Sequence, residues 1–495
     1  MRKPATLELP NDLAKCQQMI CQMHEQMQYM QHQLDRLLHA KFGQKAESLV
    51  PGQLLLFQQS SVEGSVQVQG DAPEQASGKR NSHGRRKPAK ELPRRRQVHD
   101  VPMEQRYCKC CNQELAVIGE EVSEQYDYSP ASIVVIEHVR LKRACKKCSE
   151  NVVIAPKPAT PIERGLAAPG MLAYVATSKF ADHLPLYRLE SIFKRDGAQI
   201  VRSTMCDWLA ATAQLLSPLY MLMKAEVLRS QIIWTDDTPV KMQDRSHDKN
   251  IREARVWVYI GDRLHSFTVF DFTESRKRDG PKTFLDEFVG FLQADAFAGY
   301  DCIYAGGQVT EVACHAHARR KFFEALETNK FLCSVALNII RHLYLLEKKA
   351  AQMSPEDRMV LRLEKAKPAL RAYKTWLDWQ KVRALPKSPF GKAVTYALNN
   401  WDALCIYVQN PELTIDNNRS ERALRAVAIG RKNWLFAGSR EGGRTAAVLS
   451  TVIASCKQHN INPQQYLKDV IGRICSGDAS DLRALLPDRW TAPQT

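Results

Sequence analysis

Apolar residues near the start of the chain follow a seven-residue repeat. Two sets recur at this spacing, the second three positions after the first: Leu13, Ile20, Met27 and Leu34, then Cys16, Met23, Met30 and Leu37. Polar residues surround this narrow seam, and the pattern predicts a coiled-coil dimerisation helix within residues 1–49. An amphipathic helix packed on the protein's own core would show the same period, but the narrow seam favours self-association.

The periodicity ends over residues 50–100, where Gln, Ser, Gly and Pro accumulate as they do in linkers. Nine cations lie between Lys79 and Gln97 against the single acid Glu91. Because like charges repel, we expect this basic arm to stay extended until an anion neutralises it. Its candidate DNA contacts are Arg85, Arg86, Lys87, Arg94, Arg95 and Arg96. The alternative is a solvated basic linker with no specific partner.

Two Cys-x-x-Cys pairs flank a Val- and Ile-rich strand pattern at 133–140, in a small module over residues 101–158. Such pairs, brought together across a short sheet, form the tetrahedral thiolate site that structural Zn²⁺ prefers. The predicted ligands are Cys108, Cys111, Cys145 and Cys148, with Cys110 as a spare thiol beside the first pair. Free thiols or a redox pair are the alternatives. Four protein ligands leave no open position for catalysis, so this metal would stabilise the fold.

Residues 159–228 have a helical pattern, interrupted by a turn at Asp196 and Gly197. Ser203 or Thr204 is the expected cap of the helix that follows. A helix, a glycine turn and a second helix fit a helix-turn-helix unit that binds DNA. They fit an ordinary helical hairpin equally well.

The pattern changes to strands in residues 229–325. Predicted strands occupy 231–236, 255–260, 264–270, 290–295 and 309–314, with a tight turn at 261–262 and a crossover helix at 281–289. This order describes a ribonuclease H-like α/β core, in which the first and fourth strands are neighbours. Asp236 and Asp295 should then lie side by side at the edge of the sheet. Two such carboxylates repel one another unless a cation lies between them, and Mg²⁺ prefers oxygen ligands of this kind.

A two-ion site for phosphoryl transfer needs a third carboxylate beside these two. The best candidate is Glu421, because Arg422 and Arg425 beside it suit phosphate. Its spacing from Asn418 also matches a helix capping box, in which the Glu side chain bonds backbone amides and contacts no metal. The rival candidates are Asp416 and Glu311.

Residues 326–410 predict an all-helical insertion that interrupts the catalytic core, with helices at 331–347, 359–380 and 391–408. The last part of the core then spans 411–475, and residues 476–495 form a C-terminal tail. Trp376, Trp379 and Trp401 are expected in the core of the insertion. A stacking platform for DNA is the alternative role of these rings.

Composition narrows the classes of function. The chain has 70 Lys and Arg against 54 Asp and Glu, a net charge of +16 and a pI near 9.2, which favour nucleic acid over a membrane surface as partner. Hydrophobic residues at 44% exclude a wholly disordered chain. Its 14 dispersed cysteines argue against a disulfide framework. The lack of a membrane-spanning or signal-like run predicts a cytoplasmic, nucleoid-associated protein.

These motifs together resemble the transposases of the IS66 group of bacterial insertion sequences over nearly the whole chain. The matching segments are FGQK at 42–45, LPLYR at 184–188, DDTPV at 236–240, LQADAFAGY at 292–300, AHARRKF at 316–322, DNNRSERALR at 416–425 and GRKNWLFAG at 430–438. The resemblance implies a catalytic triad on Asp236, Asp295 and Glu421, and accessory proteins encoded by the same element. The sequence departs from the family at Asp237, where Glu is common, and at His315, where an aromatic residue is usual.

Residues and resemblance together predict a DNA transposase that uses two Mg²⁺ or Mn²⁺ ions to cut element ends and joins the 3′ hydroxyl ends to double-stranded target DNA. A homodimer or larger assembly would bring two ends together. His317 is a candidate for orienting water or DNA, with a structural histidine as the alternative. Further candidate DNA contacts are Arg319, Arg320, Arg422, Arg425, Arg431 and Lys432. A metal-dependent nuclease or resolvase on the same fold, or a non-catalytic zinc-containing DNA-binding protein, are the competing hypotheses.

Overall fold

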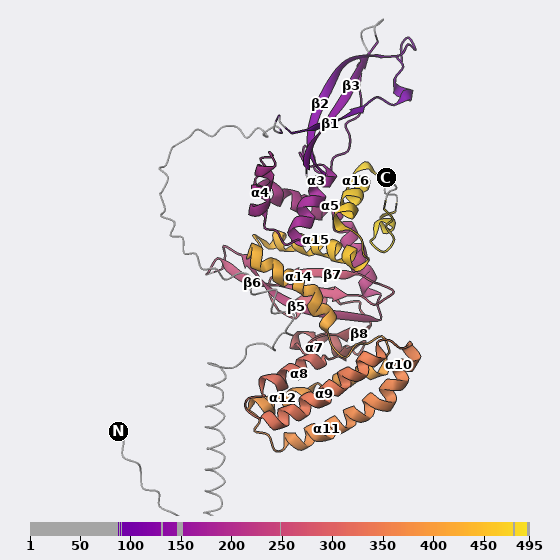
Figure 1. The fold of residues 1–495 in the computed structure, drawn as a ribbon. Helices are drawn as coiled ribbons and strands as arrows, with labels where there is room; N and C mark the ends of the chain where they lie inside the picture. Colours follow the sequence, from indigo (N-terminus) through magenta and orange to yellow (C-terminus); the bar gives the residue numbers. More distant parts are fainter. Residues whose placement is uncertain are drawn as a thin grey trace, which may run out of the picture. The chain divides into compact units, whose positions relative to one another are not determined.

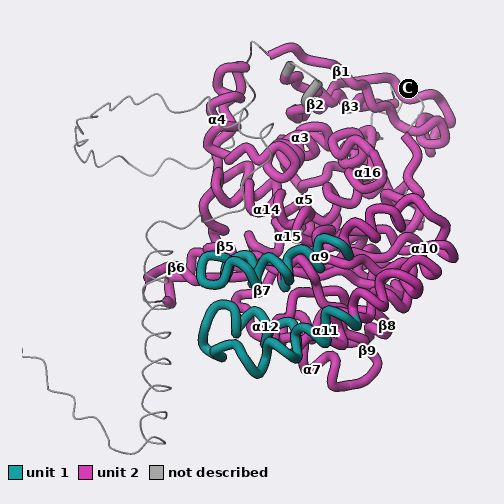
Figure 2. The backbone as a smooth tube through the Cα atoms, turned by 60° about the horizontal axis from the view of Figure 1, so that its bottom comes forward, with its two compact units in different colours: residues 1–85, 318–343, 371–399 teal, residues 86–317, 344–370, 400–495 magenta. Residues whose placement is uncertain are grey.

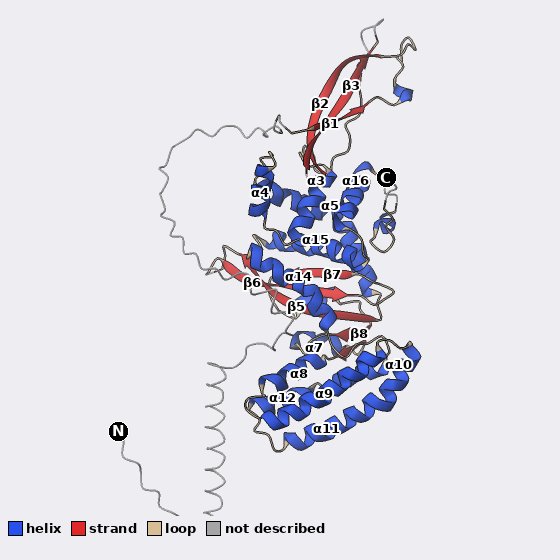
Figure 3. Ribbon diagram, viewed as in Figure 1, coloured by secondary structure: helices blue, strands red, loops and turns tan. Residues whose placement is uncertain are grey.

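The computed structural model describes Pro88, Lys90 and residues 92–129, 132–145, 152–247, 249–478 and 481–492. The predicted coiled coil, most of the linker, Arg85, Arg86, Lys87 and Cys148 lie outside these ranges. The described chain is a mixture of sheets and helices (Figure 3), as predicted. It falls into two compact units (Figure 2), of which the larger holds residues 86–317, 344–370 and 400–495. The described part of the smaller unit comprises residues 318–343 and 371–399.

The cysteine module is built on a four-stranded sheet of β1 (Arg94–His99), β2 (Ala116–Ser129), β3 (Ser132–Ala144) and β4 (Val152–Ile154). Strand β1 differs from the prediction, because the end of the expected linker pairs in parallel with β3. Acids of β2 supply the physical reason. Arg94 donates to Glu124 at 2.8 Å and Arg96 pairs with Glu120, so the protein itself neutralises part of the basic arm.

Three helices follow, α3 (Pro169–Phe180), α4 (Leu186–Arg195) and α5 (Arg202–Leu228). The turn between α4 and α5 is confirmed, since Gly197 has φ +84°, a backbone conformation that favours glycine. The predicted cap of α5 is wrong. Val201 occupies the N-cap position without a side-chain hydrogen bond, and Ser203 and Thr204 already lie in the first helical turn.

The central sheet has five strands: β5 (Ile232–Gln243), β6 (Ile251–Ile260), β7 (Thr268–Thr273), β8 (Gly290–Gln293) and β9 (Val309–Val312), in the order β7-β6-β5-β8-β9 (Figure 1). Strands β5, β6 and β7 pair antiparallel, whereas β8 and β9 join in parallel. Helices α6 (Asp279–Phe284) and α7 (Asp301–Tyr304) lie in the connections before β8 and β9.

All five strands differ from the prediction at one boundary or both. Strand β6 begins earlier, at Ile251, and β8 and β9 end earlier, so that Asp295 lies two residues past the end of β8. Strand β5 continues past Asp236 through Pro239, so that acid lies within the strand and not at its end. Strand β7 begins at Thr268, not at 264, because Asp262 accepts the backbone N–H groups of Leu264 and His265 at 3.0 Å each. This side-chain turn replaces the tight two-residue hairpin.

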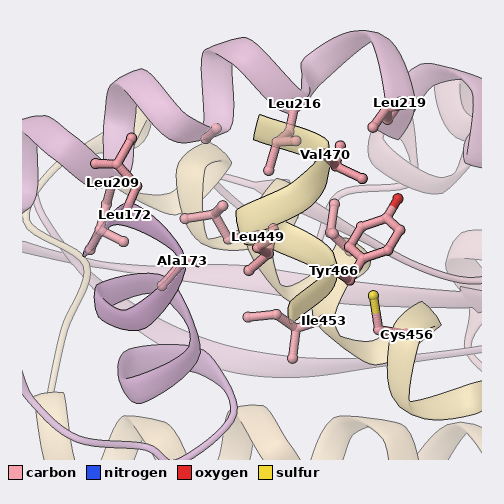
Figure 4. Close-up of a cluster of buried hydrophobic side chains, with 14 of the residues drawn as sticks. Leu172, Ala173, Leu209, Leu216, Leu219, Leu449, Ile453, Cys456, Tyr466 and Val470 are labelled. Carbon is pink, nitrogen blue, oxygen red and sulfur yellow. The ribbon is translucent and has the colours of Figure 1, made fainter. Parts of the chain in front are cut away.

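Helices α14 (Asn418–Trp434) and α15 (Arg440–Gln458) pack on this sheet, and α16 (Pro463–Ser476) packs with α3 and α5 around α15 (Figure 1). Buried side chains of α3, α5, α15 and α16 pack together in one large hydrophobic core (Figure 4). The expected C-terminal tail takes part in this core. Leu485 and Leu486 are fully buried, and Trp490 donates to Asp469 at 2.7 Å.

The helices of the insertion are α8 (His315–Glu324), α9 (Lys330–Ala350), α10 (Pro355–Leu361), the π-helical turn η3 (Arg362–Ala366), α11 (Lys367–Lys381), α12 (Pro389–Asn399), α13 (Trp401–Cys405) and η4 (Ile406–Gln409). In the smaller unit, Trp376 packs against Phe322 and Phe390. The predicted core position of Trp379 is wrong. It lies on the opposite face of α11 from the buried Tyr373 and Leu377, is 51% exposed, and stacks with Arg383.

Every helix among the described residues is too short or too polar to cross a lipid bilayer.

Candidate active site

Two acids meet where strands β5 and β8 lie side by side. These strands pair in parallel with Trp234 opposite Gln293, so two residues further along Asp236 comes level with Asp295. Burial and the charge of Asp295 raise the pKa of Asp236 to about 7. Burial also raises the pKa of Asp295, against the opposing effects of His317 and Arg276. The strand order thus yields the expected pair of neighbouring carboxylates.

The buried side-chain amide of Asn417 fixes the start of helix α14 to strand β5. Asn417, fully buried, donates from Nδ2 to the backbone oxygen of Thr235 at 2.7 Å and accepts from Ser420 Oγ at 2.8 Å. This bond anchors the helix beside Asp236. Glu421, in the first turn, lies near enough for its charge to contribute to the raised pKa of Asp236.

Glu421 does not form the capping box. The backbone N–H of Asn418 donates to Asp416 Oδ1 at 3.2 Å, and the Asn418 side chain donates to Asp416 Oδ2 at 2.7 Å. Both carboxylate oxygens of Asp416 therefore accept hydrogen bonds from Asn418 within this turn. Glu311 lies elsewhere, on β9, where burial and the charge of Asp301 raise its pKa.

His317 lies between two of the acids. Its Nε2 is 4.0 Å from Glu421 Oε1, and its charge favours ionised Asp295. His315, two residues earlier on α8, has a different role. It is fully buried, its ring donates from Nε2 to the backbone oxygen of Leu404 at 2.9 Å, and burial lowers its pKa to about 4, so it remains neutral at pH 7.

Sequence reasoning missed a second layer of charges beside the acids. Asp237, whose side chain is 2% exposed, accepts from Arg255 at 3.1 Å and from Arg276 Nε at 2.9 Å. Arg276 also reaches Asp295 Oδ2 at 3.4 Å and lies 4.0 Å from the centre of the Phe297 ring. The sequence shows only a basic run at 276–278 after a predicted strand. Such a run does not indicate which acids its side chains contact.

The predicted DNA-contact residues differ in their surroundings. Arg422, Arg425 and Lys432 are exposed along α14, and on α8 Arg320 is exposed and Arg319 partly exposed. Arg431 has an internal role. It donates to Thr238 Oγ1 at 2.8 Å and to the backbone oxygen of Pro239, which ties the far end of α14 to β5.

The thiols of Cys108, Cys111 and Cys145 converge within 4.8 Å of one another, with Cys111 and Cys145 Sγ atoms 3.3 Å apart. Cys110 is exposed and outside this group, which resolves the choice between it and its neighbours. The fourth predicted ligand, Cys148, lies outside the described residues. Among the residues that the structure covers, these thiols are the tight group of metal-ligating atoms, so the three carboxylates stand further apart than this.

Comparisons with known proteins agree with these observations. The chain matches the family described as Transposase IS66 family over residues 164–445, the zinc-finger binding domain of transposase IS66 over 105–149, and the IS66 C-terminal element over 451–487. It also matches Transposase C of IS166 homeodomain over 29–96. The cluster of Cys108, Cys111 and Cys145 is therefore a structural zinc site.

Relatives of similar length occur in Sinorhizobium fredii. The uncharacterized protein y4jD is 31% identical over 98% of this chain and 98% of its own length, and y4hP is 32% identical over 77% of this chain and 73% of its own. The similarity to y4jD extends across the acid site, because it covers nearly the whole chain. The chain belongs to the IS66 family of transposases.

Proposed function

We propose that this transposase hydrolyses phosphodiesters at the ends of a DNA element with Asp236, Asp295 and Glu421, and transfers the freed 3′ hydroxyl ends into target DNA. One observation carries the proposal. At the junction of β5, β8 and α14, two acids that are far away in sequence, Asp295 and Glu421, add to the effect of burial and raise the pKa of Asp236. Buried carboxylates that repel one another are costly to a fold and are typical of functional sites.

The sheet supports a ribonuclease H-like core for this chemistry. Three antiparallel strands are followed by two parallel ones, in the order β7-β6-β5-β8-β9, with the acid-bearing helix α14 after the helical insertion. The three proposed acids are Asp236 within β5, Asp295 two residues past the end of the neighbouring strand β8, and Glu421 in the first turn of this helix. A fold of this kind keeps the reacting groups on rigid elements, which favours in-line attack on a phosphodiester.

The residues fit a pair of Mg²⁺ or Mn²⁺ ions. Asp236 and Asp295 offer oxygen ligands whose pKa values are raised by burial, so a cation would relieve their repulsion, and Glu421 would complete the ligand set. Two ions are the arrangement that in-line phosphoryl displacement uses. Bound ions would activate the attacking oxygen and stabilise the leaving one.

The chain's own side chains would position the DNA. Arg422 and Arg425, exposed beside Glu421, would hold phosphates of the bound strand, and His317 would orient the attacking water. Pairing of two copies through residues 1–49, accessory proteins of the element and a cytoplasmic, nucleoid-associated location remain predictions of the sequence.

The test is a cleavage and strand-transfer assay with Mg²⁺ and DNA that carries the ends flanking the gene. We expect Asp295→Asn and Glu421→Gln to lower both activities by about 10³-fold or more with DNA binding intact. The matched control is Glu441→Gln, because Glu441 is also in the first turn of a helix but is exposed. Cleavage that survives in Asp295→Asn would refute the proposal. Cleavage without strand transfer in the unaltered protein would indicate a nuclease or resolvase.

A further inference from the structure

Arg276 occupies an unusual position beside the acids. It lies in the loop between β7 and α6, and its guanidinium bridges two carboxylates. Nε and Nη2 contact Asp237 Oδ1 at 2.9 and 2.8 Å, and Nη2 also contacts Asp295 Oδ2 at 3.4 Å. The face of the guanidinium lies over Phe297 at 4.0 Å. A loop arginine thus contacts one carboxylate oxygen of Asp295, a proposed ligand of the metal ions.

The two carboxylates depend on Arg276 to different degrees. Asp237 has a second cation in Arg255, whose side chain is only 17% exposed and is fixed on β6. Asp295 has His317 as its other favourable neighbour, which supplies a full positive charge only when protonated. The Arg276 side chain is 38% exposed and lies on a loop, so it is the cation of this group that can leave without unfolding a strand.

We propose that Arg276 exchanges partners during the reaction cycle, an inference that depends on the proposed function. It neutralises Asp295 while no divalent ion is bound, and turns to a phosphate of the DNA strand once an ion occupies Asp295. A guanidinium and a metal ion compete for the same carboxylate oxygen, because two cations so close together repel. The released fork matches two phosphate oxygens, and the Phe297 ring keeps it near the site. Arg276 is therefore a positioning residue that couples ion binding to strand binding.

The first measurement is the affinity for Mn²⁺, by calorimetry on the full-length, zinc-loaded chain without DNA. Removing the competing cation in Arg276→Gln should tighten Mn²⁺ binding about five- to tenfold, the effect of one charge-assisted hydrogen bond shared with solvent. Arg278→Gln, an exposed arginine two residues away on the same loop, is the matched control and should bind as the unaltered protein does. Unchanged Mn²⁺ affinity in Arg276→Gln would overturn the partner exchange of Arg276 but not the proposed function. Failure of the unaltered protein to bind Mn²⁺ would overturn the proposed function.

The second measurement is DNA affinity with and without a divalent ion that supports binding but not cleavage. In Ca²⁺, Arg276→Gln should weaken DNA binding about five- to tenfold, whereas in buffer passed over chelating resin it should bind as tightly as the unaltered chain. A purely structural role would change both conditions equally, and that result would contradict the exchange.

A second variant guards against misfolding of Arg276→Gln. Arg276→Lys keeps the charge that competes with the ion but lacks the planar fork. We expect its Mn²⁺ affinity to equal that of the unaltered protein, and its DNA affinity in Ca²⁺ to fall. Tighter Mn²⁺ binding by this lysine variant would show that charge competition is not the cause.

Discussion

Replacing Asp236 with asparagine should stabilise the protein at pH 8 when it holds zinc but no magnesium, although it removes a proposed catalytic acid. Burial raises the pKa of Asp236 to about 7, with Asp295 and Glu421 adding to the effect, from an ordinary value of 3.8. An acid with a higher pKa in the folded state binds its proton more tightly there. Its contribution to stability is therefore complete below about pH 4 and is lost as the pH rises through about 7.

The magnitude follows from this difference in pKa between the folded and unfolded states. A change from 3.8 to about 7 corresponds to about 4 kcal/mol at pH 8. Part of this cost is shared with Asp295 and Glu421, because the three acids titrate together and one retained proton relieves the others. We expect Asp236→Asn to recover about 2 kcal/mol of unfolding free energy at pH 8 and little at pH 4.

Urea denaturation at pH 4, 6 and 8, with and without Mg²⁺, measures this effect. Magnesium should stabilise the unaltered protein and leave Asp236→Asn nearly unchanged, because the variant lacks a ligand. Asp262→Asn is the control, because the pKa of Asp262 is lowered in the folded protein whereas that of Asp236 is raised. Burial alone would raise the pKa of Asp262, but N–H groups of Gln231 and His265 outweigh it and lower the pKa, so this variant should be less stable at pH 8.

Two outcomes would refute the reasoning about Asp236. One is a loss of stability in Asp236→Asn at pH 8 without magnesium, which would mean that the ionised carboxylate has favourable partners. The other is an equal gain at pH 4 and pH 8, which would assign the effect to packing and not to charge.

Three further changes test other parts of the molecule. Cys145→Ser should lose the bound zinc, measured by elemental analysis, whereas Cys110→Ser should retain it because that thiol is outside the cluster. Arg362→Met should lower the unfolding free energy by about 3 kcal/mol in urea titrations, since it leaves the carboxylate of Glu347, 13% exposed and 2.6 Å from Arg362, without this buried partner. Trp379→Ala should change stability by less than about 0.5 kcal/mol in the same assay, because this ring is half exposed.

The parts of the site that the sequence could predict depend on local patterns. Alternating apolar residues identify five strands, and the rule that strands one and four are neighbours brings Asp236 and Asp295 together. The paired cysteines likewise need only their spacing to indicate zinc. Each of these inferences uses a short segment and one general rule of chain geometry, so an error of a residue or two at a boundary does no harm. Strand β5 extends well past its predicted end, yet Asp236 keeps its neighbour.

The parts that the sequence could not predict depend on contacts between distant segments. Arg276 reaches Asp237 from 39 residues away, and no local pattern indicates that direction. The capping box, the alternative role of Glu421, does not form. Asp416, two residues before Asn418, accepts the Asn418 backbone N–H that Glu421 would have bonded. The exposure of Trp379 depends on which face of α11 meets its neighbours, and the position of the tryptophan in the sequence does not determine it. Polar interactions of this kind are decided by competition among neighbours that only the folded chain supplies.

The segment just before α14 connects Glu421 to the central sheet. It is bonded to β5, which bears Asp236, and to the last residue of β8, two residues before Asp295. Gln293 of β8 donates to the backbone oxygen of Thr414 and accepts from its hydroxyl at 2.9 Å, and Trp234 of β5 donates to the same hydroxyl at 3.1 Å. Asn417 completes the connection to β5. The bond from Asn417 is buried, so breaking it would leave a polar group without a partner at a cost of about 1–3 kcal/mol. The insertion holds the same segment from its other side, because Arg362 donates to the backbone oxygens of Asn410 and Leu413 at 2.8 and 2.9 Å. The position of the third acid is therefore set by the sheet and by the insertion together.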